Sequence, residues 1–316
     1  MTERSFEGVV LLGFPRSGTT MLRRLLGIHP ELCCPPETHV LRACAAFVQP
    51  DGSPLGHSTD VATSLRFVGI DPEHVMERVR QLAFGLLRDV CAQYGKPIWV
   101  EKSALDIFHI GALDRLLGDR CRFLWISRHP ADVVSSVKEY VAKVEYYYPE
   151  LYEYVRRHPI PLEAFAHAWV DAQRNMIAFA EKRGDVCLPL RYETLVAEPE
   201  EQLRRILDFL ELRGDASALL RGLGESAGAV GYGDWKTYER TTVGAESVGR
   251  FRSVPPRLLA RVGAIVNATA VELGYEPVVV PEQTLRPDPV RQLKLDQAMM
   301  HTTAVRQRNT KRNTSA

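Results

Sequence analysis

The chain has 316 residues, of which 45% are apolar and 25% charged, with 22 glycines and 20 prolines. These values are close to those of ordinary globular proteins and exclude collagen-like, disordered and coiled-coil chains. The 40 basic and 39 acidic residues leave a formal charge of +1, so we expect no nucleic-acid partner held by bulk charge. Any anion that the protein binds must be held by a local cluster of residues.

The N-terminus and the cysteines bear on the cellular compartment. The apolar run at residues 9–14 is too short for a signal peptide, and no later segment reaches the roughly 18 apolar residues of a membrane span. The six cysteines are scattered without the C-x-x-C spacing of a zinc site or redox motif, and the adjacent Cys33 and Cys34 are expected to be reduced thiols. We therefore expect a cytoplasmic protein without a membrane span.

The hydrophobic pattern alternates between strands and helices along the chain. Short apolar runs predict strands at residues 9–13, 97–101, 121–127 and 186–190. Helical patterns occur between or after them, at residues 20–26, 74–94, 165–176 and 203–210. This alternation indicates βαβ units. It predicts an α/β fold of three layers, in which a central, mainly parallel sheet is flanked by helices.

Three segments depart from this alternation. Residues 45–71 contain scattered Gly, Pro and Ser and are expected to be irregular. Residues 140–158 hold six of the eleven tyrosines. They predict either a lid or wall of an acceptor pocket or an amphipathic helix at the face of a homodimer. Residues 286–316 carry seven Lys/Arg and two Asp. We therefore divide the chain into a domain, residues 1–280, and a basic tail, residues 281–316, that is mobile or docked on a partner.

The clearest motif is GFPRSGTT at residues 13–20, between a predicted strand and a predicted helix. Two glycines five positions apart let backbone N–H groups turn inward, and the helix N-terminus favours an anion. The spacing equals that of the P-loop G-x-x-x-x-G-K-[ST], but Thr19 replaces the lysine, and no acidic residue for Mg²⁺ follows the strand at 121–127. We therefore expect an anion site without a metal. The alternative is an ordinary Gly-containing turn.

A second basic position follows the strand at residues 121–127. Arg128 precedes Pro130, which opens a helix that carries Asp132 and Ser136. Because parallel strands end at the same edge of a sheet, Arg16 and Arg128 are expected to face one extended ligand with two anionic groups. Two such groups without a metal indicate a nucleotide that bears a 3′-phosphate. The alternative is that Arg128 only pairs with Asp132 at the surface.

These motifs resemble those of a known family. GFPRSGTTMLRRLL resembles the 5′-phosphosulfate loop of PAPS-dependent sulfotransferases, and WISRHPADVVSS resembles their 3′-phosphate motif. HPELCCPPETH and WVEKSALD are similar to the tyrosylprotein sulfotransferases and their bacterial relatives, while LPLRYETLVAEPEEQLRRILDFLEL and SVGRFR are similar to later segments of the family. The resemblance covers about residues 8–275. It implies a P-loop-like fold, PAPS as sulfuryl donor and PAP as product. The residues that it assigns to the nucleotide are Arg16, Ser17, Gly18, Thr19, Thr20, Arg128, Ser136, Tyr192 and Arg250.

Sulfuryl transfer needs a base for the acceptor hydroxyl and cations for the charge that grows on the sulfuryl oxygens and the leaving phosphate. Arg16 and Lys102 are the candidate cations; the alternative for Lys102 is a solvated loop position. The resemblance gives Glu37 the position of the catalytic glutamate of the tyrosylprotein branch. His39, two residues further on, is the alternative base.

We therefore expect a PAPS-dependent sulfotransferase that moves the sulfuryl group to an acceptor hydroxyl by in-line displacement and releases PAP. The membrane anchor and luminal disulfides of the secretory tyrosylprotein enzymes are not evident, so a small molecule, lipid or glycan is expected as acceptor ahead of a peptide tyrosine. The alternatives are a P-loop kinase that uses Mg·ATP and a non-catalytic nucleotide-binding scaffold.

Overall fold

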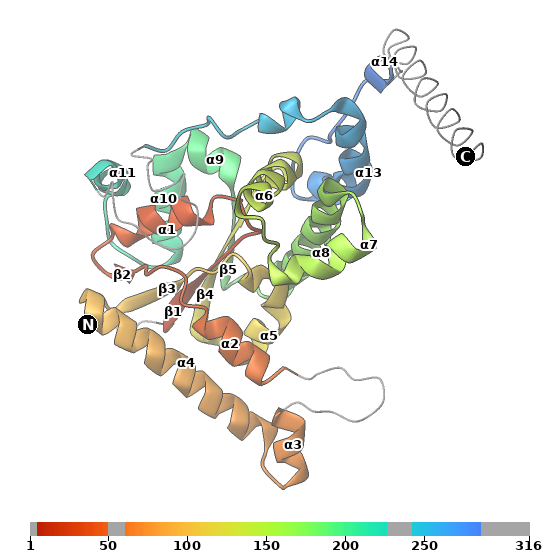
Figure 1. Cartoon of the computed structure of the whole chain (residues 1–316). Helices are drawn as coiled ribbons and strands as arrows, with labels where there is room; N and C mark the ends of the chain where they lie inside the picture. Colours follow the sequence, from red (N-terminus) through yellow and green to blue (C-terminus); the bar gives the residue numbers. More distant parts are fainter. Residues whose placement is uncertain (1–4, 50–60, 226–241, 286–316) are drawn as a thin grey trace, which may run out of the picture.

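A five-stranded sheet forms the centre of the molecule. The computed structural model describes residues 5–49, 61–225 and 242–285. The strand order is β2-β3-β1-β4-β5, and every neighbouring pair is parallel. Helices cover both faces of the sheet (Figure 1), so the predicted three-layer α/β fold is confirmed. The strands are β1 (Gly8–Leu12), β2 (Leu32–Cys33), β3 (Ile98–Glu101), β4 (Cys121–Ser127) and β5 (Cys187–Arg191).

The helices fall into two groups, one on each face. One face carries α1 (Thr19–Gly27), α9 (Tyr192–Ala197), α10 (Pro199–Phe209) and α11 (Ala216–Glu225). The other carries α2 (Val40–Phe47), α4 (Pro72–Tyr94), α5 (Ile110–Leu117), α6 (Pro130–Val144), α8 (Pro161–Lys182) and α13 (Pro256–Glu272). The shorter elements are α3 (Val61–Phe67), α7 (Tyr152–Arg157), α14 (Glu282–Leu285) and the 3₁₀ turns η1 (Asp106–His109), η2 (Gly118–Arg120), η3 (Pro149–Leu151) and η4 (Arg250–Ser253).

Every strand and helix that was predicted is present in this structure, whereas α2, α5 and α11 are helices that were not predicted. Strand β2 has only two residues, too few for a periodic pattern, and was not predicted. Residues 45–71 were expected to be irregular, and this was wrong for residues 45–47 and 61–67, because α2 continues to Phe47 and α3 follows from Val61. No Gly or Pro interrupts residues 61–67. Residues 50–60, and the predicted tail beyond α14, lie outside the described residues.

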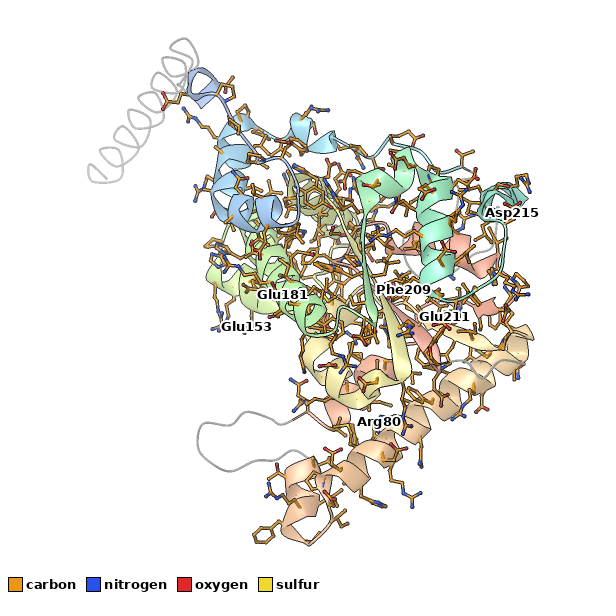
Figure 2. All side chains as sticks on the ribbon, turned by 180° about the vertical axis from the view of Figure 1, so that it is seen from behind. Arg80, Glu153, Glu181, Phe209, Glu211 and Asp215 are labelled. Atoms are coloured by element: carbon orange, nitrogen blue, oxygen red, sulfur yellow. The ribbon has the colours of Figure 1, made fainter. Side chains whose placement is uncertain are left out.

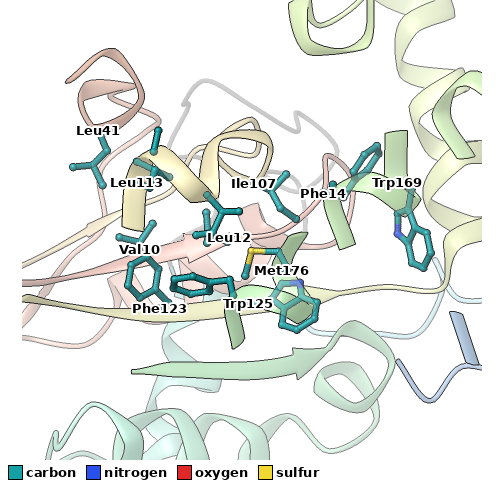
Figure 3. Close-up of a cluster of buried hydrophobic side chains, with 14 of the residues drawn as sticks. Val10, Leu12, Phe14, Leu41, Ile107, Leu113, Phe123, Trp125, Trp169 and Met176 are labelled. Carbon is teal, nitrogen blue, oxygen red and sulfur yellow. The ribbon is translucent and has the colours of Figure 1, made fainter. Parts of the chain in front are cut away.

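Alternate side chains of the strands build two separate cores. In β1, Val9 and Leu11 face the α1 side, whereas Val10 and Leu12 face the α8 side. Figure 3 shows Val10 and Leu12 beside Phe123 of β4 and among residues of α2, α5 and α8. Because both faces are covered, the strands are continuous apolar runs, which is typical of parallel sheets.

Charged side chains lie around these cores. Figure 2 labels Glu153 and Asp215 at opposite sides of the molecule. Glu153 pairs with Arg156 at 2.8 Å and Asp215 with Arg221 at 3.3 Å, and exposed pairs of this kind contribute little to stability. The apolar cores therefore hold the fold. Within the described ranges, no helix has both the length and the apolar character needed to span a membrane.

The strand register gathers the predicted functional segments at one edge. Leu12, the last residue of β1, lies opposite Trp125 of β4, and Val10 lies opposite Glu101 of β3. The loops after these three strands therefore leave the sheet side by side at its carboxyl edge, where parallel sheets bind ligands.

Candidate active site

The loop between β1 and α1 turns its backbone inward. Gly18 directly precedes α1 and has φ 97° and ψ 8°, a left-handed conformation that residues with a side chain rarely adopt. A Cβ atom at this position would lie 2.5 Å from Cδ2 of Tyr192, so only glycine fits. No side chain caps α1, and its first backbone N–H groups are therefore available to an anion.

Arg16 occupies a strained position in the same loop. Its φ is 75°, and a residue with a side chain keeps such a conformation only where its surroundings hold it. Arg128 Nη1 donates to the Arg16 carbonyl at 3.0 Å, and Arg16 Nε donates to Ser136 Oγ at 3.2 Å. The Arg16 guanidinium also lies 5.5 Å from the centre of the Tyr140 ring. The predicted proximity of Arg16 and Arg128 is thus observed.

Arg128 connects three parts of the site and is itself buried. Its guanidinium lies 4.6 Å from the centre of the Tyr192 ring, and Nη2 donates to the Ser247 carbonyl. Nη2 also lies 3.7 Å from Oδ2 of the buried Asp132. The alternative interpretation placed a pair between Arg128 and Asp132 at the surface, but both side chains are buried and Arg128 lines the cavity.

Asp132 holds the turn that contains Arg250. Its two carboxylate oxygens accept the backbone N–H groups of Gly249 at 2.7 Å and Phe251 at 2.9 Å. Arg250 lines the cavity with 38% of its side chain exposed, and it pairs with Glu139 at 2.9 Å. The N-terminal turn of α6 and the η4 turn are thereby fixed to each other.

Lys102 follows β3 and lies inside the site. Its side chain is only 1% exposed, so the alternative of a solvated loop position is wrong. Nζ donates to Glu37 Oε1 and, at 3.3 Å, to Thr20 Oγ1. Burial lowers the pKa of Lys102, while the carboxylate of Glu37 opposes this shift. The candidate base and the candidate cation are therefore direct partners in the absence of a ligand.

The second candidate base, His39, lies beside Glu37. Its Nε2 is 3.9 Å from Glu37 Oε2, and its Nδ1 is 3.2 Å from Ser103 Oγ. The backbone N–H of His39 donates to Glu101 Oε1 at 3.0 Å. The structure thus brings both candidates to the same part of the cavity.

The tyrosine-rich segment forms one wall of this cavity. Tyr140, Tyr146 and Tyr148 line it, and the rings of Tyr140 and Tyr148 stack with centres 5.4 Å apart. Burial raises the pKa of Tyr148, which keeps its hydroxyl neutral. Arg42 also lines the cavity, but its charge is paired with Glu150 at 2.6 Å. This wall is therefore aromatic and close to neutral.

The cavity has a volume of about 460 Å³ and contains nearly all of the predicted site residues. Those that line it are Arg16, Gly18, Thr19, Thr20, Glu37, His39, Lys102, Arg128, Ser136, Tyr192 and Arg250. Ser17 is the exception, since its side chain is fully buried behind the loop. The chain's own described residues offer no hydrogen-bond partner to Ser17 Oγ or to Arg128 Nε. Arg128 lines the cavity, and its unpaired donor fits a ligand that bears phosphate and sulfuryl groups.

The sequence did not indicate every residue that matters here. Glu101 and Arg42 were not singled out as functional residues, Tyr148 was considered only as part of the tyrosine-rich segment 140–158, and Asp132 only as a surface partner. Glu101 and Asp132 act through contacts with segments 62 and 117 positions away. For Glu101, the sequence offered one signal: an acidic residue ends the otherwise apolar strand IWVE. Among the residues that the structure describes, no group of three His, Cys, Asp or Glu side chains is placed to hold a metal ion.

Comparison with solved structures agrees with this fold. A sulfotransferase domain from the curacin biosynthetic pathway superimposes with a TM-score of 0.57 at 20% identity, over 87% of this chain and all of that domain. A sulfotransferase domain from the Synechococcus PCC 7002 olefin synthase gives 0.56 at 23% identity, over 87% of this chain and 98% of that domain.

Sequence relatives are similar over most of the chain. Protein-tyrosine sulfotransferase 1 of Danio rerio is 25% identical over 88% of this chain and 75% of its own length. Nodulation protein NoeE of Sinorhizobium fredii is 29% identical over 84% of this chain, which spans only 65% of that protein. The sequence profile of the sulfotransferase family matches residues 8–216. The kinase alternative is not favoured, and the predicted enzyme class is confirmed: the chain belongs to the sulfotransferase family.

Proposed function

We propose that this sulfotransferase transfers the sulfuryl group of PAPS to a hydroxyl of an uncharged acceptor, and that the residues described above carry the reaction. The observation behind the proposal is a single cavity in which Arg16, Lys102 and Arg128 surround the phosphate loop while Glu37 faces the same space. Three cations and one carboxylate suit a reaction that withdraws one proton and stabilises charge on an anionic leaving group.

The proposed nucleotide contacts form two groups, one at the phosphate loop with Lys102 and one at Arg128 with Ser136. PAPS supplies an activated sulfuryl group on its 5′-phosphate and carries a second anion as its 3′-phosphate. The loop N–H groups, Thr19 and Thr20 would hold the 5′ end, where Arg16 and Lys102 stabilise negative charge. Arg128 and Ser136 would hold the 3′-phosphate. Tyr192 packs against both Gly18 and Arg128, and from this position its ring would lie near the adenine.

Glu37 is the proposed base. Its carboxylate lines the cavity, is 15% exposed and already has the geometry to accept a hydrogen bond. When an acceptor hydroxyl replaces Lys102 as its partner, Glu37 takes the hydroxyl proton and Lys102 is released toward the sulfuryl oxygens. His39 lies beside Glu37, and 44% of its side chain is exposed to solvent. Its imidazole would stabilise the Glu37 carboxyl group after that group has taken the proton.

The acceptor is proposed to be a small molecule, lipid or glycan. Tyr146, Tyr148 and Pro149 line the cavity together, and Arg42, which also lines it, is already neutralised by Glu150. Aromatic rings offer rigid apolar area to the face of a ring or chain, whereas an acidic peptide would need unpaired positive charge. A panel of phenols, sterols, glycans and tyrosyl peptides, scored by PAP release, tests this choice.

The nucleotide part of the proposal is tested by calorimetric titration with PAP and, separately, with Mg·ATP. We expect PAP to bind and Mg·ATP to bind weakly. Arg128→Ala should weaken PAP binding by about ten- to a hundredfold, because a charge-assisted contact contributes roughly 1.5–3 kcal/mol. Arg156→Ala, on the outer face of α7, is the matched control. Preference for Mg·ATP over PAP would overturn the proposal, and PAP binding without turnover would favour a scaffold.

The choice between the two bases is tested by comparing Glu37→Gln with His39→Gln in single turnovers of PAPS. Loss of a positioned base typically lowers the rate by about 10²–10⁴. We expect this loss for Glu37→Gln and a smaller one for His39→Gln. The reverse order would make His39 the base.

Two broader features complete the proposal. All six cysteines are buried free thiols, which supports a reducing compartment such as the cytoplasm. A homodimer and a basic docking tail remain predictions from the sequence. Light scattering on the full chain, with and without residues 281–316, tests both.

A further inference from the structure

Glu101 is a fully buried carboxyl group that has no place among the residues lining the cavity. It is the last residue of β3, and both of its oxygens are used by the segment that contains the candidate base. Oε2 accepts the hydroxyl of Thr38 at 2.8 Å, and Oε1 accepts the backbone N–H of His39 at 3.0 Å. A buried carboxyl group is costly unless it is fully hydrogen-bonded, so these two contacts explain how it is accommodated.

The two contacts control an unfavourable turn. His39 has φ 59°, a left-handed conformation for a residue with a side chain, and it precedes the first residue of α2. Thr38 Oγ1 also accepts the backbone N–H of Val40 at 3.3 Å, which closes the turn into the helix. Glu101 binds both the Thr38 hydroxyl and the His39 N–H. It therefore fixes the backbone of this turn, and with it the directions in which the Glu37 and His39 side chains point.

Charged groups approach Glu101 from each neighbouring element. Glu37 lies on the base segment, Lys102 follows on its own strand, and the buried Asp106 lies on η1. Burial raises the pKa of Glu101 to about 7, the contacts from Thr38 and His39 oppose this shift, and the charge of Glu37 adds to it. Near pH 7 the group is therefore about half protonated, and its protonated form is neutral. Glutamine imitates that state, since its carbonyl can accept from His39 and its amide can donate to Thr38 Oγ1.

We propose that Glu101 is a positioning residue of the active site: through Thr38 and the His39 backbone it sets the geometry of Glu37 and His39 toward the acceptor hydroxyl. This inference rests on the proposed function. Glu101 itself neither touches the nucleotide nor transfers a proton. The two hydrogen bonds of Glu101 go to Thr38 and His39 and to none of the residues proposed to hold the phosphates, so the positioning of the base can fail while nucleotide binding persists.

The test compares Glu101→Ala, Glu101→Gln and Thr38→Val with the intact chain. Asn267→Ala is the matched control, because Asn267 makes two contacts of the same kind with the backbone of Val278, at 3.1 and 2.8 Å, away from the cavity. The first readout is hydrogen exchange of the His39 amide, followed by mass spectrometry of the peptide that contains it. We expect exchange to be at least tenfold faster in Glu101→Ala and unchanged in Glu101→Gln and Asn267→Ala.

The second readout is PAP release from PAPS with p-nitrophenol as the hydroxyl probe. For Glu101→Ala we expect kcat to fall at least tenfold with KM for PAPS and PAP affinity within twofold of wild type, and Glu101→Gln to recover most of kcat. Thr38→Val removes the hydroxyl that donates to Glu101 and accepts the Val40 N–H, but it leaves the contact between Glu101 and the His39 N–H. Its kcat should therefore lie between those of the two Glu101 variants, and it also replaces Glu101→Ala if that variant does not fold.

Two results would overturn the inference. One is unchanged His39 exchange in Glu101→Ala and Thr38→Val. The other is a loss of kcat in Glu101→Gln as deep as in Glu101→Ala, which would make Glu101 a proton-transferring group. Failure of the intact chain to bind PAP would refute the proposed function instead, and the exchange measurement would still report on the contact.

Discussion

Replacing Gly18 by alanine should damage the phosphate loop in two separable ways. An alanine would have to adopt φ 97°. Its Cβ would also lie 2.5 Å from Cδ2 and 2.9 Å from Cε2 of the Tyr192 ring. That ring is 3% exposed and lies under the Arg128 guanidinium at 4.6 Å, so it cannot move without displacing the arginine.

Both effects can be given a size. A left-handed conformation costs a residue with a side chain of order 1–3 kcal/mol. Overpacking a well-filled site typically costs about 1–3 kcal/mol more. We therefore expect the free energy of unfolding of Gly18→Ala to fall by about 2–6 kcal/mol. PAP affinity should fall at least tenfold, because displacement of Tyr192 and Arg128 disturbs the residues proposed to hold the 5′- and 3′-phosphates.

Urea unfolding of Gly18→Ala, Tyr192→Leu and the double variant measures the steric part as a coupling energy. Gly69→Ala is the control for backbone strain alone, since its φ is 87° and nothing lies within 4 Å of the added Cβ. Gly18→Ala should cost clearly more than Gly69→Ala, and Tyr192→Leu should relieve the difference. Equal costs at the two glycines, together with unchanged PAP affinity, would refute this account of the loop.

Two other variants probe the buried carboxyl groups. Asp132→Ala removes the acceptor of the Gly249 and Phe251 N–H groups; each bond to a charged acceptor contributes roughly 1.5–3 kcal/mol, so calorimetry should show PAP affinity reduced at least tenfold. Unchanged affinity would mean that other contacts hold this turn. The pKa of Glu101 is raised from 4.5 to about 7 in the folded chain, so its contribution to stability is complete below pH 4.5 and is lost as the pH rises through 7. The loss corresponds to about 3 kcal/mol, and urea unfolding at pH 5 and pH 8 should show a smaller pH difference for Glu101→Gln than for wild type. An equal difference in both proteins would assign the pH dependence to other groups.

The sequence by itself determined four of the five strands, several of the helices and the phosphate loop, because these depend on local patterns. Continuous apolar runs specify buried parallel strands, and β4 has the predicted bounds at both ends. Two glycines between a strand and a helix specify an anion-binding loop, and this local motif does not depend on the position of the strand in the sheet. Arg128 followed by Pro130 likewise marks the end of a strand and the start of a helix. Parallel topology then accounts for the meeting of Arg16 and Arg128 at one edge.

The tertiary structure alone decided the relations between distant segments. The pairing of Lys102 with Glu37, the turn that Asp132 holds and the contacts of Glu101 join residues that are 65, 117 and 62 positions apart. Such contacts depend on strand order and register, which no local pattern encodes. A buried carboxyl group is tolerated only where the assembled fold satisfies it, so the roles of Glu101 and Asp132 become visible only once their partners are in place.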